Sequence, residues 1–381
     1  MPIQPGTYRV AAQINVNNGT ILPIYSFTLD LNGYNLVTSF EVRTPIWSLD
    51  AAPKKKAAID HCKLMQAACD VGKGYPVQLQ VSYEAVSPTN TTSQRPTAFL
   101  TLETGNVDEI QLDFGANEQT FICRSAGALI QEARVQGSGF PKFALGSQLI
   151  AYFMAQYAPG VSMTIIPSLL PAGHSFTEVD YTKTARGQSV FDYVTQAAQD
   201  DGYILTLHNN KGYYGPPGMY PGAPTVNLAW GRDLIDCKVD HAARRTRNIQ
   251  VVVTGINQRK QARILAQYPP MAAATTEKVF IDAKHNHTKA SLLAFAQQQY
   301  YEICSKEFVV QADLIPDPAF LKILATYGPH FYARLSGMLP SINTPLYHCR
   351  QAHVEYDGLD DAPSIKVALT VENHAPSITG G

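Results

Sequence analysis

The chain carries little charge. Asp, Glu, Lys and Arg make up 16% of its 381 residues, whereas about 25% is usual for soluble proteins. The two signs nearly cancel, with 30 Lys and Arg against 31 Asp and Glu, so no net field draws the protein to nucleic acid or to an anionic membrane. A neutral polar surface costs little free energy to desolvate, so it can be buried readily against other subunits. The same composition is equally compatible with a weakly charged monomer.

Long apolar runs, targeting signals and paired cysteines are also missing. No stretch of about 18 apolar residues occurs, and residues 1–5 lack the basic and apolar regions of a secretory signal. We therefore expect no membrane span and assembly in a reducing cytoplasm. The six cysteines are scattered with no CxxC pair, which indicates separate thiols; they are Cys62, Cys69, Cys123, Cys237, Cys304 and Cys349.

No strong catalytic motif is present, since GxGxxG, Walker A, HExxH and GxSxG are all absent. His285 and His287 could share one side of a strand, but no third metal donor is adjacent. Asp200-Asp201 and Asp360-Asp361 are neighbouring carboxylates, whereas glycoside hydrolysis needs two carboxylates facing each other across a cleft. We predict no catalytic residue, no metal site and no cofactor, and hence that the protein is not an enzyme.

Residues 1–120 predict β structure. Residues 7–16 alternate between apolar and polar, and Asn17-Asn18-Gly19 and Asn32-Gly33 are turn signals. Further strands are expected over residues 36–42, 78–83, 97–103 and 107–114, with a turn at Gly105-Asn106. Strands at close, even spacing are typical of a sandwich or barrel.

Helical spacing begins near Phe121, with helices expected around residues 126–133, 148–157 and 189–201. Ser189 and Asp192 approximate a capping box for the last of these, and Gly202 fits its C-terminal end. A strand over residues 203–208 and a turn follow. We therefore expect residues 121–224 to form a small α/β domain, ending in a Gly- and Pro-rich loop.

Residues 225–381 return to β structure. Strands are expected at 249–254, 307–314, 331–335, 347–356 and 365–372, with an irregular crossover at 268–276. One long helix is expected from a cap at Thr288 to about Cys304. The predicted layout is β structure, a small α/β insert, and β structure with one long helix.

A local basic cluster stands out against the neutral total. Seven Lys and Arg lie between residues 238 and 263 against one acid, Asp240, and stacking aromatics are absent from the cluster. We expect either a rim that meets a partner or faces a channel, or a solvated edge. The basic residues are Lys238, Arg244, Arg245, Arg247, Arg259, Lys260 and Arg263.

Three stretches in this order resemble one family. They are residues 105–130, residues 187–204 closed by Gly212-Tyr213-Tyr214-Gly215, and the helix 288–304 followed by 308–314, Tyr327-Gly328 and 347–356. The order is similar to that in the baseplate hub proteins of contractile-tailed bacteriophages, the late-control-protein-like tail hubs, and of related injection machines. The resemblance spans about residues 100–375.

The resemblance implies a fold and a role. It implies two tail-tube-like β-barrel domains, at 1–120 and 225–381, flanking the small α/β domain. It also implies a homotrimer whose six barrels adapt the sixfold tail tube to a threefold central spike. Its expected partners are a separate spike protein, a tail tube or tube-initiator protein, the tape measure protein and baseplate wedge proteins. DNA would only pass through transiently. The expected location is the virion tail baseplate, after assembly in the bacterial host cytoplasm.

Two alternatives remain. One is a β-sandwich carbohydrate-binding or polysaccharide-degrading tail protein, although strand-like flanks make Trp47 and Trp230 better core or interface candidates. The other is a tail-completion or tube-capping protein with the same barrel. A stable trimer without affinity for glycans would favour the hub.

Overall fold

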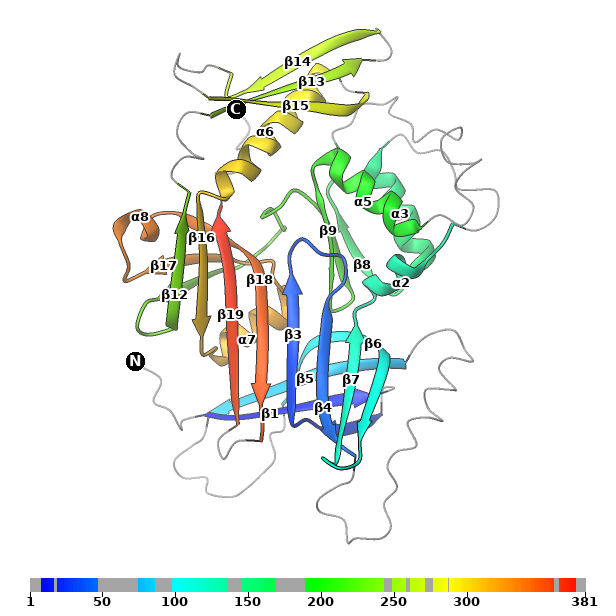
Figure 1. Ribbon diagram of the computed structural model, residues 1–381, viewed down its shortest axis with the longest axis vertical. Coiled ribbons are helices and arrows are strands. Elements are labelled where there is room, and N and C mark those ends of the chain that lie inside the picture. The colour runs from blue at the N-terminus through cyan, green and yellow to red at the C-terminus, as the bar shows by residue number, and fades with distance from the viewer. Residues whose placement is uncertain are drawn as a thin grey trace.

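The protein is predominantly β and contains three sheets. The computed structural model describes residues 8–16, 19–46, 75–85, 98–135, 145–168, 189–242, 249–257, 261–270, 277–286, 288–359 and 363–374. One sheet has thirteen strands and the other two have three each. The large sheet forms the lower body, and the smaller sheets lie above it with their helices (Figure 1).

The large sheet is built from both ends of the chain. Its path is β12-β16-β19-β18-β3-β4-β7-β6-β5-β1-β2, with β17 beside β18 and β11 beside β17. The N-terminal strands are β1 (Tyr8–Val16), β2 (Thr20–Pro23), β3 (Ser26–Asn32), β4 (Ser39–Pro45), β5 (Tyr75–Ala85), β6 (Leu100–Asp113) and β7 (Glu118–Arg124). The C-terminal strands are β11 (Thr225–Ala229), β12 (Leu234–His241), β16 (Phe308–Leu314), β17 (Tyr332–Ser336), β18 (Leu346–Asp357) and β19 (Ser364–Asn373).

Strand β3 joins the two β regions. It pairs antiparallel with β18 from Ser26 opposite Asp357 to Asn32 opposite Gln351. The prediction of a mainly β protein is therefore confirmed, and the two β regions share one large antiparallel sheet.

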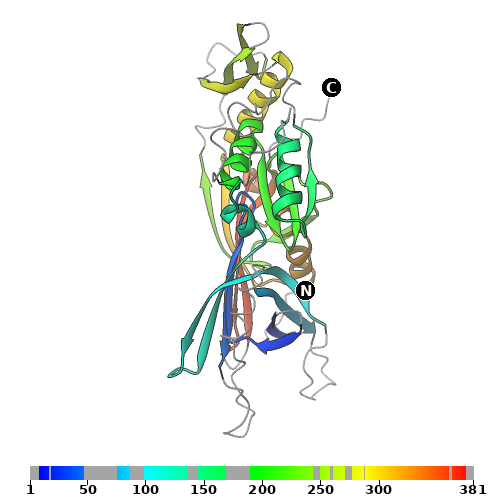
Figure 2. The same ribbon diagram turned by 90° about the vertical axis from the view of Figure 1, so that its right-hand side faces the viewer.

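Apolar side chains gather on one face of this sheet. In β3, Phe27, Leu29 and Leu31 are buried while the residues between them are more exposed, which is the period-2 pattern of a sheet with one face in the core. Helix α7 (Pro318–Tyr327) packs on the buried face, and the short α8 (Pro340–Asn343) lies beside β17. Figure 2 shows the sheet nearly edge-on, with α7 and α3 on the same side of it.

The expected turn at Gly105-Asn106 is wrong, because β6 runs unbroken through both residues. Its first part pairs with β5 as far as Val107, and its later part pairs with β7. A Cβ atom on Gly105 would lie 2.4 Å from the carbonyl oxygen of Arg124. Glycine therefore marks a close approach of two strands rather than a turn.

The small α/β unit follows β7. It contains α2 (Gly127–Glu132), α3 (Gly146–Tyr157), β8 (Ser162–Ile165), α5 (Val190–Asp201), β9 (Ile204–His208) and β10 (Lys211–Gly215). Gly202 ends α5 in the left-handed conformation, with φ of 65°, as expected. The capping box is wrong: Ser189 makes no side-chain cap, and the Val190 amide donates instead to the Ala133 carbonyl at 3.0 Å.

A third unit replaces the expected single strand and irregular crossover. Strands β13 (Ile249–Asn257), β14 (Ala262–Tyr268) and β15 (Glu277–Asn286) form a sheet of their own. Helix α6 (Lys289–Ser305) begins at the expected cap, since the Ser291 amide donates to the Thr288 hydroxyl at 3.2 Å. Leu292 and Ala296 of α6 pack on Val251 and Val253 of β13. The long helix therefore covers this small sheet.

Substituting Gly105→Ala tests the strand crossing. Its Cβ would overlap the backbone of β7, so we expect a loss of roughly 1–3 kcal/mol in the free energy of unfolding, measured by denaturant titration. Gly160→Ala is the matched control, because a Cβ there has no neighbour within 4 Å. A Gly105→Ala protein as stable as the control would contradict the close approach.

Candidate assembly and channel surface

Eight consecutive strands of the large sheet form a fully antiparallel ribbon, β12-β16-β19-β18-β3-β4-β7-β6. Among the described residues, β12 pairs only with β16, and β6 has no partner opposite β7 beyond Val107. The ribbon therefore has two edges. Because the number of strands is even, these edges run in opposite directions.

Within the part of the chain that the structure describes, the edge at β12 presents backbone donors without a partner strand. The Ala242 amide donates to the carbonyl of Glu307, which directly precedes β16, at 2.8 Å. In an antiparallel ladder alternate amides point the same way, so those of Val239 and His241 point away from β16. The Cys237 amide also points outward and donates to the Asp236 carboxylate at 2.8 Å. An edge of this kind can accept another strand.

The ribbon's second face is polar. His353 of β18 lies opposite Asp30 of β3. In the neighbouring row, Thr28 of β3 lies between Glu355 of β18 and Glu41 of β4. Acidic side chains outnumber basic ones on this face. The acids are Asp30, Glu41, Glu109, Asp113, Glu118, Asp236, Asp240, Asp313, Glu355 and Asp357, with Glu372 buried at the upper end of the face, and the bases are Arg43, Arg124, Lys238, Arg350 and Lys366.

Only some of the charged side chains on this face form ion pairs or hydrogen bonds with one another. His353 lies 3.0 Å from Glu355 and also contacts Asp30 at 2.5 Å. Partial burial lowers the pKa of His353, but the hydrogen bonds to the two carboxylates outweigh it, so the net pKa is raised. Arg43 pairs with Glu41 at 3.2 Å. Such a surface suits contact with water or with a moving polyanion rather than tight binding.

Tyr34, in the β3–β4 turn, ties β3 to β18 and β19 at the upper end of this face. Its hydroxyl donates to Glu372 at 3.3 Å and lies 3.3 Å from Nε2 of His348. Arg350 pairs with the same carboxylate at 2.6 Å and lies over the Tyr34 ring at 5.4 Å. The charge of the buried Glu372 is thus balanced.

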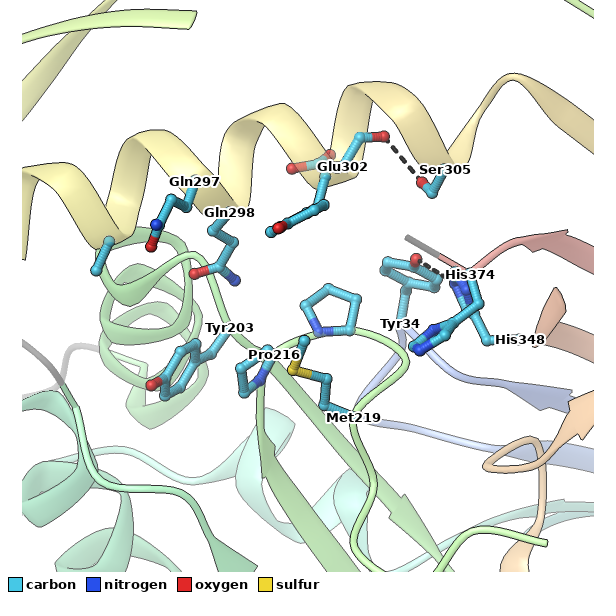
Figure 3. Close-up of a pocket in the computed structure, with 13 residues that line it drawn as sticks. Tyr34, Tyr203, Pro216, Met219, Gln297, Gln298, Glu302, Ser305, His348 and His374 are labelled. Carbon is cyan, nitrogen blue, oxygen red and sulfur yellow. Dashed lines mark hydrogen bonds between the residues drawn. The ribbon is translucent and has the colours of Figure 1, made fainter. Parts of the chain in front are cut away.

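A cavity of about 130 Å³ separates α6 from the loop after β10. Figure 3 shows Gln298 and Glu302 of α6 above it, Pro216 and Met219 below, and Tyr34, His348 and His374 at one end. The lining is mostly aromatic and apolar, so this junction holds α6 with few polar contacts.

A buried hydrogen-bonded pair joins the small α/β unit to the large sheet. Glu103 of β6 accepts a hydrogen bond from the Asn209 amide at 2.7 Å, and Nδ1 of His208 lies 2.8 Å from the same carboxylate. Both side chains are buried. The Asn209 side chain donates to the Ala325 carbonyl at the end of α7 at 3.2 Å. Three elements far apart in sequence therefore meet at the β9–β10 turn.

The predicted basic cluster is brought together only in part. Lys238 lies on the polar face at β12, 3.6 Å from Asp240, while Arg263 is exposed on β14 of the small sheet. Arg244, Arg245, Arg247, Arg259 and Lys260 lie outside the described residues. Whether the seven form one surface stays a prediction.

The carboxylates and histidines considered as catalytic or metal-binding candidates in the sequence are only partly described by the structure. Asp201 is buried and accepts hydrogen bonds from Ser168 and Tyr214 near the start of α3. Asp360-Asp361 and His287 are outside the described residues. Within the residues that are described, no group of three His, Cys, Asp or Glu is placed to hold a metal ion. The described helices include none long and apolar enough to cross a membrane.

Sequence reasoning missed Tyr34, Glu103, His208 and Glu372. The Asn32-Gly33 turn signal was adjacent to Tyr34, and Glu103 was the only charged residue in the first half of its strand. Their partners lie far away in sequence, so neither signal identified a contact.

The fold resembles that of tail proteins. A tail protein from Neisseria meningitidis MC58 superposes with a TM-score of 0.60 at 11% identity, over 96% of this chain and 97% of the other. The 43 kDa tail protein of prophage MuSo2 from Shewanella oneidensis gives 0.59 at 9% identity, over 95% and 97%. The E. coli c3393 protein gives 0.51 at 8% identity, over 95% and 77%; it is a type VI secretion component structurally similar to the T4 phage tail proteins gp27 and gp5. No family model and no curated protein matches the sequence.

Acid should destabilise the fold through His348. Burial, with the nearby His374 and Arg350, lowers the pKa of His348 to about 3, so the folded protein keeps it neutral while the unfolded chain protonates it below about pH 6.5. Stability is therefore lost as the pH falls from about 6.5 towards 3, by about 2 kcal/mol at pH 5 from this group. We expect His348→Gln to reduce the difference in unfolding free energy between pH 7 and pH 5 by that amount.

His353→Gln is the control, because its effect on the pH dependence of stability should have the opposite sign. Its raised pKa makes protonation of His353 favour the folded state, and that contribution is present at low pH and is lost as the pH rises through the folded pKa. Removing His353 should therefore steepen acid destabilisation. Equal pH profiles for both variants and the parent protein would contradict this assignment.

Proposed function

We propose that the protein is the structural baseplate hub of a contractile phage tail. In this proposal it is a homotrimer of pseudo-sixfold symmetry that adapts the sixfold tail tube to the threefold central spike and lines the channel for genome passage. Its partners are the spike, a tail tube or tube-initiator protein, the tape measure protein and the baseplate wedge. It acts in the virion and has no enzymatic role.

The eight-stranded ribbon is the observation that carries this proposal. It divides at the β3–β18 pairing into two sets of four strands, one from each β region. Three copies supply six such sets, so a threefold ring presents a sixfold arrangement. The remaining strands, β1, β2 and β5 in one region and β11 and β17 in the other, then complete two barrel-like domains at about 1–120 and 225–381. Residues 121–224 form the insert between them.

The two edges explain how copies join. Because β6 and β12 run in opposite directions, β6 of one copy and β12 of the next can pair antiparallel, which continues the order within the chain. This contact is head-to-tail, and head-to-tail contacts close into rings when the rotation allows. Closure also removes the exposed edges, which would otherwise invite aggregation.

The polar face then lines the channel. Its surplus of Asp and Glu repels the phosphate backbone of DNA, and its few lysines and arginines are partly paired. A polyanion would therefore move past this wall without being held.

The carbohydrate-binding alternative has one favourable observation. Trp230 is 45% exposed, so of the expected core or interface positions it does not occupy a core one, and an exposed indole can stack on a sugar ring. No aromatic ring of the described residues contacts it, so a sugar platform would need residues from elsewhere. Trp47 lies outside the described residues.

The proposed ring can be tested by measuring the solution mass of the protein and of a variant altered at the β12 edge. We expect light scattering to give about three times the 41.7 kDa of one chain, and His241→Pro, which removes an outward-pointing edge donor, to give the monomer with unchanged circular dichroism.

His241→Ala is the matched control, because the His241 ring stacks on Phe308 and alanine removes that ring while keeping the backbone N–H. It should remain trimeric. A trimer that withstands proline at 241, or a monomer in the unsubstituted protein at every concentration, would argue against edge pairing.

A further inference from the structure

The small sheet at one end of the molecule has an uncovered apolar face. Helix α6 packs on the side of β13 that carries Val251 and Val253, so the alternate residues point away from α6. On that outer face Phe280 is 73% exposed, Ile256 54% and Leu265 52%. Large apolar side chains at this exposure, grouped on one face, indicate a contact surface.

The three side chains belong to one continuous surface. Phe280 lies opposite Val252, which is 4% exposed, and Leu265 lies opposite Thr254 in the next row. Ile256 follows on the same side of β13. Each of the three strands therefore contributes one exposed apolar side chain to this face, with Thr254 and Asp282 in the row of Leu265.

The rim of this face is basic. Arg263 lies opposite Ile256 and Lys278 opposite Gln250; both are exposed, and neither forms an ion pair with a described residue. The one acid on this face, Asp282, accepts a hydrogen bond from Thr254. Residues 249–306 carry seven Lys and Arg against three Asp and Glu, although the whole chain is nearly neutral.

We propose that this face, defined by Ile256, Leu265 and Phe280 with Arg263 and Lys278, docks a second tail protein through an acidic surface with an apolar centre. The inference rests on the proposed function and adds the chemistry of one axial partner. Cations alone would suit nucleic acid equally well, but three exposed apolar side chains favour a protein surface.

The position of the face fits an axial contact. Strands β12, β16, β19, β18, β3 and β4 of the large sheet run along the long axis of the molecule, whereas β1 and β5 run across it, and β13–β15 lie at one end of that axis (Figure 1). In a ring whose channel follows the strands, three copies of the face therefore point along the channel axis. Three weak contacts made together bind far more tightly than one.

The hairpin turns at the opposite end of this chain combine exposed apolar side chains with acids, which is the chemistry that would complement this face. The hairpin turns there expose Phe114 by 67% and Leu359 by 65%, beside the acids Asp113, Glu118 and Asp357. A tail protein that ends in hairpins of this composition would match the basic, apolar face in both charge and apolarity.

Photo-crosslinking in assembled tails tests the proposal. Phe280→p-benzoylphenylalanine places a photoreactive ring on the face with little change in shape, and Thr28→p-benzoylphenylalanine is the matched control on the polar face. We expect position 280 to crosslink to a different tail protein, at a peptide rich in Asp and Glu, and position 28 not to reach that protein. Mass spectrometry of the crosslinked peptides identifies the partner.

Charge variants add a quantitative readout. Arg263→Glu combined with Lys278→Glu should lower the crosslinked fraction at least about tenfold, whereas Arg263→Lys, which keeps the charge, should not. Crosslinks from position 280 only to this chain, to DNA or to lipid, or no crosslinks, would overturn the inference while leaving the hub intact. Absence of the chain from tails would overturn the proposed function, and the inference with it.

Discussion

The pairing of β3 with β18 is the contact on which the rest of the architecture depends. It brings residues near the N-terminus, such as Ser26, opposite residues near the C-terminus, such as Asp357. Without it the chain would hold two separate sheets with four edges. With it there is one ribbon with two edges of opposite direction, and the polar faces of both halves become continuous. The ring proposal follows from that geometry, since backbone groups at a sheet edge are satisfied by another strand or by water.

Buried polar contacts place the small α/β unit against this sheet. The Glu103–His208 pair fixes the β9–β10 turn on β6. The Tyr34–Glu372–Arg350 group ties β3, β18 and β19 together within the large sheet, and Tyr34 lines the mostly apolar cavity below α6. Breaking one partner of such a pair leaves a buried group unsatisfied, which costs more than the pair contributes when intact. These contacts therefore specify where these elements sit more than they add to stability, whereas the apolar core of the large sheet supplies most of the burial.

Local signals in the sequence predicted local structure well. The helix at 189–201 with its C-terminal Gly202, the Thr288 cap and most strands of the large sheet follow from periodicity and end signals, whereas β2, β7, β11 and β12 were not predicted. Strands β14 and β15 were missed because only one face of their sheet is covered, so exposed Leu265 and Phe280 obscure the alternation. Helix α7 was missed although Asp317 and Pro318 form a start signal there. Gly105 was misread because its close neighbour, Arg124, is reached only by folding. The edges and the polar face could not be predicted, since strand order is a tertiary property.

Hydrogen exchange at the β12 edge tests the central claim most directly. The amides of Val239 and His241 point away from β16, so they should exchange rapidly in an isolated chain and become protected when copies assemble into a ring. Peptide-resolved exchange on monomeric and assembled protein would show this, with the amides of the central strand β3 as an internal reference that is protected in both. Protection of β12, together with the outer half of β6, on assembly is the predicted result. Rapid exchange at both edges in the assembled protein, with protection appearing elsewhere, would contradict closure of the ring through its sheet edges.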